Sequence, residues 1–134
     1  MILTIKVKLH SWSGIFEIDD SSTSEDLHYV IQQAVEFDND HLYEFYLASS
    51  DRSRHRNIIS TYEDADTVIL ASIFPLAKGK KLFYLFDYGD NWVFQISQSR
   101  KAPFIAASAT RYPQIISETG ERPTQYPDWE DDDA

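Results

Sequence analysis

Residues 81–99, KLFYLFDYGDNWVFQISQS, join an apolar aromatic run, a short acidic turn and a second apolar run. Residues 82–86 are apolar at every position, which is typical of an inner strand that is covered on both faces. The turn contains Asp87 and Asp90, and the return run begins at Trp92. This pattern predicts a central β-hairpin that carries two carboxylates at its tip.

Upstream of the hairpin, residues 1–9 alternate between apolar and polar positions, which predicts a half-buried strand, and residues 15–18 can return as its hairpin partner. Residues 27–35 then have apolar side chains at the spacing of an amphipathic helix. Ser22 and Glu25 precede them at capping-box spacing. Residues 41–48, HLYEFYLA, are a further aromatic-rich strand candidate.

Two segments have weaker patterns. Residues 58–66 are ambiguous, because their β-branched start permits a strand while Asp66 or Thr67 can cap a short following helix. Residues 112–129 contain three prolines and little periodicity, so we expect an extended segment that wraps over the body.

The order of these elements predicts an α+β fold: a ββαβ start, a central hairpin, and one long amphipathic helix on a face of a mostly antiparallel sheet. The chain of 134 residues has the length of one domain. We therefore expect a single domain over residues 1–127 and an acidic disordered tail over residues 128–134.

The formal net charge is −10, from 22 acidic and 12 basic residues, and five of the acids lie in the last seven positions. A surface that binds duplex nucleic acid needs clustered Lys and Arg, so this balance argues against general nucleic-acid affinity without excluding a local patch. The chain has no cysteine and no apolar stretch of membrane-spanning length. We expect a cytoplasmic protein without a membrane segment, as a monomer or weak dimer.

Three segments together resemble the plasmid ORF-three-like family, small proteins named for an open reading frame of a root-inducing plasmid and related to passenger proteins of insertion elements. They are residues 27–45 of the helix and following strand, residues 84–92 (YLFDYGDNW) and residues 120–126 (GERPTQY). The resemblance implies an α+β fold and an association with mobile elements, but no settled activity. Many members have His two residues after the Trp, where this chain has Phe94.

Asp87 and Asp90 are the strongest candidates for chemistry, because a turn brings side chains three positions apart onto one side. They can act as a general acid and base or as ligands for a hard metal ion, and His41 can join them if the strands are neighbours. The alternative is structural: both carboxylates accept backbone N–H bonds in the turn, and His41 is a partly buried, hydrogen-bonded side chain. His28, at the edge of the apolar stripe, is expected on the helix surface.

Two binding surfaces are also expected. Tyr88, Asp90 and Trp92 at the hairpin tip are candidates for contact with a protein partner. Arg52, Arg54 and Arg56 form the densest basic run and can bind an anion, together with Lys78, Lys80 and Lys81 if these lie nearby. With no cysteine and four scattered histidines, no metal site and no cofactor is expected.

The sequence favours a binding or accessory module with an unknown protein partner over an enzyme. A metal-dependent or acid–base hydrolase built on Asp87, Asp90 and His41 is the alternative. Nucleic-acid binding through the arginine run is the weakest hypothesis because of the overall charge.

Overall fold

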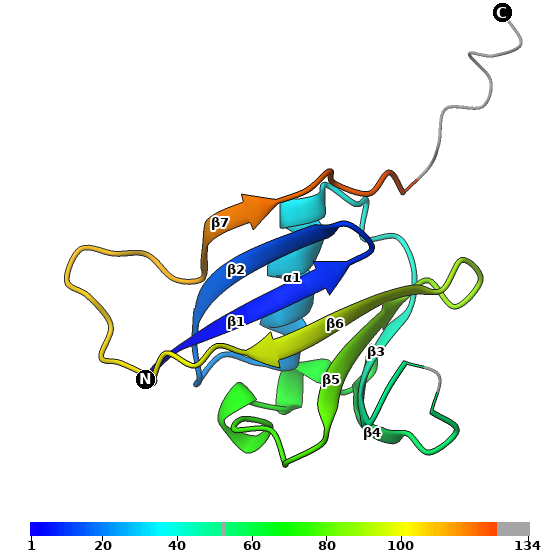
Figure 1. Cartoon of the computed structure of the whole chain (residues 1–134), viewed down its shortest axis with the longest axis horizontal. Helices are drawn as coiled ribbons and strands as arrows, with labels where there is room; N and C mark the ends of the chain where they lie inside the picture. The colour runs from blue at the N-terminus through cyan, green and yellow to red at the C-terminus, as the bar shows by residue number, and fades with distance from the viewer. Residues whose placement is uncertain (52, 126–134) are drawn as a thin grey trace, which may run out of the picture.

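The computed structural model describes residues 1–51 and 53–125, and within them seven strands form one antiparallel sheet in the order β4-β3-β5-β6-β1-β2-β7 (Figure 1). The strands are β1 (Ile2–Leu9), β2 (Trp12–Asp19), β3 (Tyr43–Ala48), β4 (Asn57–Thr61), β5 (Lys81–Phe86), β6 (Trp92–Gln98) and β7 (Gln114–Thr119). A helix, α1 (Ser24–Val35), crosses behind the sheet in the view of Figure 1. Two 3₁₀ turns, Ala65–Thr67 and Leu70–Ser72, lie between β4 and β5.

The predicted α+β class with a long helix is wrong. The described elements begin in the order strand, strand, helix, strand, but α1 has only 12 residues and the protein is essentially all-β. The difference comes from the two weakly patterned segments, which supply β4 and β7 as the two edge strands of the sheet. Residues 65–72 form the two 3₁₀ turns, where a short helix was one of the two structures expected.

The capping box of helix α1 lies one residue later in the chain than predicted. The Thr23 side chain accepts from the Asp26 backbone N–H at 3.1 Å, and the Asp26 carboxylate accepts from the Thr23 N–H at 2.9 Å. The box is therefore Thr23 and Asp26, in place of Ser22 and Glu25. The helix ends at Val35, and its C-cap residue Glu36 has a φ of 60°, the left-handed conformation common at helix C-termini.

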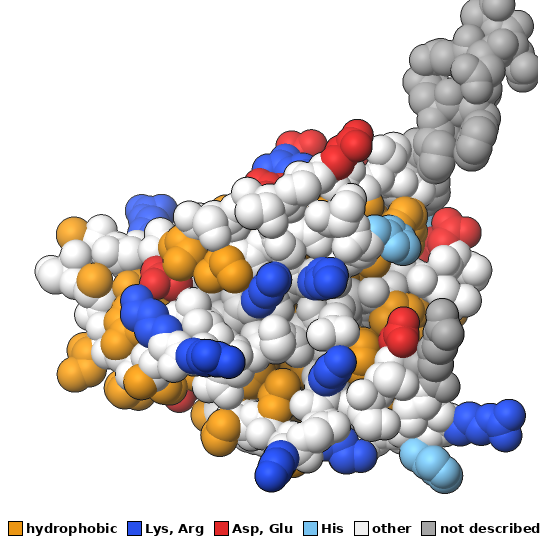
Figure 2. Space-filling model, in the orientation of Figure 1, with side chains coloured by type: hydrophobic (Ala, Val, Ile, Leu, Met, Phe, Trp, Pro, Cys, Tyr) orange, Lys and Arg blue, Asp and Glu red, His pale blue; other side chains and the backbone are white. Residues whose placement is uncertain are grey.

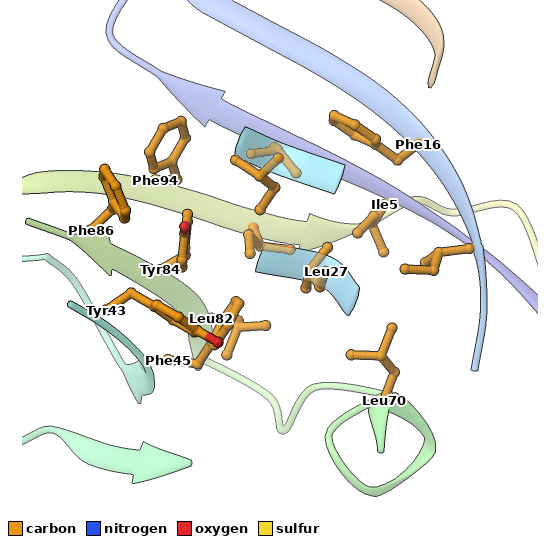
Figure 3. Close-up of a cluster of buried hydrophobic side chains, with 14 of the residues drawn as sticks. Ile5, Phe16, Leu27, Tyr43, Phe45, Leu70, Leu82, Tyr84, Phe86 and Phe94 are labelled. Atoms are coloured by element: carbon orange, nitrogen blue, oxygen red, sulfur yellow. The ribbon is translucent and has the colours of Figure 1, made fainter. Parts of the chain in front are cut away.

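The main core lies between α1 and one face of the sheet (Figure 3). Leu82, Tyr84 and Phe86 of β5 point into it, while Phe83 and Leu85 of the same strand are buried on the opposite face. Strand β5 is therefore covered on both sides, as the continuous apolar run of the hairpin predicts. The hairpin itself is confirmed: β5 pairs with β6 from Leu82↔Ile96 to Phe86↔Trp92.

The segment after β7 is bonded to the body. Gly120 has a φ of +79°, and a Cβ there would lie 1.9 Å from the Ser11 carbonyl oxygen, so only glycine fits. Further along, Gln125 accepts from the Asp38 backbone N–H at 2.7 Å and donates to the Asp40 carboxylate at 2.9 Å. The expected tail over residues 128–134 lies outside the described residues. In residues 1–51 and 53–125, no helix is long and apolar enough to cross a membrane.

Candidate functional site

The turn between β5 and β6 is organised by Asp87. Its Oδ1 accepts the backbone N–H groups of Gly89 at 3.1 Å and Asp90 at 3.3 Å, and its own N–H donates to the Leu42 carbonyl at 2.9 Å. Asp87 has a φ of 64°, a left-handed conformation that Asp tolerates because its short side chain bonds locally. With 5% of its surface exposed, this carboxylate is a buried acceptor that holds the turn.

His41 lies against the other oxygen of the same carboxylate. Its Nε2 is 3.3 Å from Asp87 Oδ2 and 3.5 Å from Asp40 Oδ1, and its ring meets Phe86 edge-on. The structure thus brings together His41 and Asp87, two of the three residues proposed for chemistry. Asp90 is exposed, and in the turn its backbone N–H donates to Asp87.

This geometry is suited to orienting the His41 imidazole rather than to forming a catalytic pair of His41 and Asp87. Both oxygens of Asp87 already have partners, so its carboxylate can position His41 but has no free oxygen facing solvent. Among residues 1–51 and 53–125, no group of three or more His, Asp or Glu side chains is placed to hold a metal ion.

The predicted partner-binding residues differ in exposure. Trp92 pairs with Phe86 and packs edge-on against Phe37, with ring centroids 5.2 Å apart, so it borders the core beneath α1. Tyr88 is 41% exposed at the tip, and its hydroxyl donates to the Tyr43 carbonyl at 3.1 Å.

Two further side chains that the sequence did not single out lie close to Tyr88. Leu42 is 46% exposed and Tyr62 is 42% exposed. The Tyr62 backbone N–H donates to the Tyr43 carbonyl at 2.9 Å, the same oxygen that the Tyr88 hydroxyl contacts. Leu42, Tyr62 and Tyr88 are therefore linked through backbone groups at the start of β3, and we call these three exposed residues the aromatic patch.

Negative charge surrounds the aromatic patch. Burial, followed by the charge of the neighbouring Glu44, raises the pKa of Tyr88 to about 12, and Glu63 adds to the same effect. The phenol therefore stays neutral at physiological pH and acts as a hydrogen-bond donor.

A buried polar network lies between α1 and the core face of β5, and the sequence did not predict it. His28 is 1% exposed, so its expected position on the helix surface is wrong. Its Nε2–H donates to Asn39 Oδ1 at 2.5 Å, and its Nδ1 accepts from the Tyr84 hydroxyl. Gln32 completes the network by donating to Tyr84 at 3.0 Å and accepting from the Asn39 backbone N–H at 3.0 Å.

His28, Gln32, Asn39 and Tyr84 form a closed ring of hydrogen bonds, which we call the His28 ring. The imidazole also stacks on Tyr43, with ring centroids 3.6 Å apart. Burial lowers the pKa of His28 to about 4, against the raising effect of its bond to Asn39, and raises the pKa of Tyr84. A sequence signal for the ring did exist: a tyrosine in a strand buried on both faces needs a partner for its hydroxyl.

The predicted anion-binding residues are partly brought together. Arg54 and Arg56 line a pocket of about 510 Å³, and Lys80 joins them from the segment that leads into β5. Arg52 lies outside the described residues. We call this hollow the basic pocket; its other lining residues are Leu47, His55, Asn57 and Ala77.

Comparisons with known proteins agree with the resemblance noted in the sequence. A family model described as "Plasmid pRiA4b ORF-3-like protein" matches residues 2–126. The chain is also similar in structure to a protein of unknown function from Methanosarcina mazei Go1, with a TM-score of 0.71 and 20% sequence identity over 87% of this chain and 68% of that one. At this identity the likeness shows the fold alone. No curated protein matches the chain significantly.

Proposed function

Because the chain belongs to the plasmid pRiA4b ORF-3-like family, we propose that it is a small binding or accessory module linked to plasmids and mobile elements. Its partner is a protein, and the contact surface is the aromatic patch with Asp90 beside it. The observation that carries the proposal is the exposure of Leu42, Tyr62 and Tyr88 at one end of β3.

Three large side chains at one place on a surface are suited to protein contact. Tyrosine supplies a wide contact area with little conformational freedom to lose, and it is enriched among residues that dominate binding energy. Tyr88 is already held by its bond to the Tyr43 carbonyl, which reduces the entropy cost of ordering it on binding.

The charges around the patch indicate the chemistry of the partner. Glu44 and Glu63 act electrostatically on Tyr88, and Asp90 is exposed on the same turn. A partner surface with apolar side chains and flanking Lys or Arg would complement this arrangement.

An acid–base hydrolase remains the second candidate, because His41 and Asp87 do meet at 3.3 Å. It is the weaker one, since the Asp87 carboxylate is occupied by the turn and Asp90 contributes a backbone N–H to it. Loss of a hydrolytic activity in His41→Ala, with the fold intact, would favour this second candidate.

The test uses photo-crosslinking in lysate of the source organism, with the crosslinker placed at position 62. We expect one specific protein adduct that Tyr88→Ala abolishes. The matched control is Tyr29→Ala, which removes another exposed tyrosine, from α1, and should leave the adduct unchanged. An adduct that both alanine variants lose equally, or no specific adduct at all, would contradict the proposal.

A further inference from the structure

The basic pocket is built by strand register. Leu47 of β3 pairs with Asn57 of β4 on one side and with Leu82 of β5 on the other. The residues just before β4 and just before β5 are therefore brought to the same end of β3. Arg54 and Arg56 arrive from the first segment and Lys80 from the second, 24 residues after Arg56 in the chain.

The charge of this pocket is opposite to that of the protein. The chain has a net charge of −10, yet none of the described residues lining the pocket is acidic, and three are permanent cations at neutral pH. Figure 2 shows separate Lys and Arg side chains across the face of the protein turned toward the viewer. The pocket lining itself contains no carboxylate, so the three cations can act on one ligand there, although Asp51 lies beside Arg56 outside the lining.

Arg56 is held in place before any ligand binds. Its guanidinium lies 4.5 Å from the centre of the Tyr46 ring, and its Nη2 is 3.5 Å from the Asp51 carbonyl oxygen. Stacking on an aromatic face fixes the plane of the guanidinium and leaves other N–H groups to bind. A side chain ordered in this way loses less entropy when it contacts an anion.

We propose that the basic pocket binds a phosphate group, using the fork of Arg56 with Arg54 and Lys80 around it. Two arginines and a lysine match the charge of a phosphate, which arginine contacts through paired N–H bonds. Leu47 and Ala77 provide an apolar wall beside the cations. Inorganic phosphate, pyrophosphate and a small phosphate monoester share this chemistry, and the wall favours a monoester with an apolar body.

The experiment is calorimetric titration at constant ionic strength with three probes: inorganic phosphate, pyrophosphate and phenyl phosphate. We expect saturable binding with one site per chain. Lys80→Ala and Arg56→Ala should each weaken it about tenfold, the loss of one charge-assisted contact. Arg56→Lys keeps the charge but lacks the fork, so it should also bind more weakly.

The matched control is Lys6→Ala, which removes one exposed cation from β1 outside the basic pocket. It should leave affinity within about twofold, since exposed charges separated by more than a Debye length are largely screened. Equal losses in Lys6→Ala and Lys80→Ala, or no saturable binding of any probe, would overturn the proposal. Lys80→Ala serves as the second variant because Arg56→Ala also removes the contact with Tyr46.

Two further results separate this site from other functions. Tight binding of single-stranded DNA that depends on Lys6 and Lys8 would contradict a discrete phosphate pocket and would indicate an extended nucleic-acid surface. Tyr88→Ala should leave phenyl phosphate binding unchanged. The phosphate site can therefore be tested independently of the proposal that the aromatic patch binds a protein partner.

Discussion

His28 and His41 are both bonded imidazoles, but their surroundings differ. Both ring nitrogens of His28 have hydrogen-bond partners within a closed ring, whereas the His41 side chain is 35% exposed and lies against a carboxylate that holds the turn. Buried polar networks are strong only when complete, because each unsatisfied member keeps its full desolvation penalty. A change in the His28 ring should therefore cost more than one at the tip.

The largest effect is expected for His28→Ala. The substitution leaves a cavity against Tyr43 and removes the acceptor for Tyr84 and the donor to Asn39. We expect the free energy of unfolding, measured by urea denaturation, to fall by about 4 kcal/mol. Gln33→Ala, exposed on the same helix, is the control and should change it by less than about 0.5 kcal/mol. Equal effects would mean that the ring is not closed in solution.

The second prediction concerns acid. The pKa of His28 is about 4 in the folded protein and 6.5 for the free side chain, so between these values the unfolded chain binds the proton more readily. Stability is fully present above pH 6.5 and falls as the pH drops, by about 3 kcal/mol once the pH is below 4.

Urea denaturation at a series of pH values measures this loss. His28→Phe keeps a ring on Tyr43 but has no proton to bind, so its stability should be flat between pH 6.5 and 4.5. Glu118 does not interfere with this measurement. Hydrogen bonds from Arg122 and Trp12 lower the pKa of Glu118 from 4.5 to about 2, so its effect on stability falls below the pH range from 6.5 to 4.5. A slope that is the same in both proteins would refute the assignment to His28.

Substitutions of Asp87 in the β5–β6 turn should lower the unfolding free energy less than His28→Ala does. Asp87→Ala removes the acceptor of two backbone N–H bonds and places alanine at a φ of 64°, which should lower the unfolding free energy by about 2 kcal/mol. Asp87→Asn keeps one oxygen as acceptor and tolerates the same φ, so its cost should stay under about 1 kcal/mol. Thermal denaturation compares the two; a reversed order would show that charge, not turn geometry, holds the tip.

The smallest effect is expected for Asp90→Asn, because the bond that Asp90 gives to the turn comes from its backbone. Unfolding free energy should change by less than about 0.5 kcal/mol, as for an ordinary surface substitution. Titration of wild type and this variant with Mg²⁺, Mn²⁺ and Ca²⁺ should give no heat of binding in either. Uptake by wild type alone would restore the metal-dependent hydrolase.

Elements with a strong local pattern of apolar residues were predicted correctly from the sequence, and elements without one were not. Residues 82–86 identify the central strand by themselves, and the Asp-rich turn after them follows from ordinary turn chemistry. Strand β7 could not be foreseen, because Ile115 and Ile116 are adjacent rather than alternating and its partner β2 lies about a hundred residues earlier. The pairing of β7 with β2 is a long-range contact that no local stretch of sequence reveals, so a segment expected to be an extended wrap is an edge strand.

The same limit explains the two histidines. The proximity of His41 to Asp87 was foreseen as a possibility because residues 41–48 were expected to be a strand, and β3 does pair with β5. The burial of His28 depends on Asn39 and Tyr84, which approach from a loop and from a distant strand. One helical turn of sequence contains no sign of either neighbour.

The strand order also has a consequence for synthesis. Strands β1 and β2 occupy the first 19 residues, yet β1 pairs with β6 and β2 pairs with β7. The β1–β2 hairpin therefore leaves the ribosome with both of its edges unpaired, and residues 92–119 follow only several seconds later at roughly 5–20 residues per second. We expect the nascent chain to depend on chaperones during that interval, and a chain stopped before β6 to aggregate rather than fold.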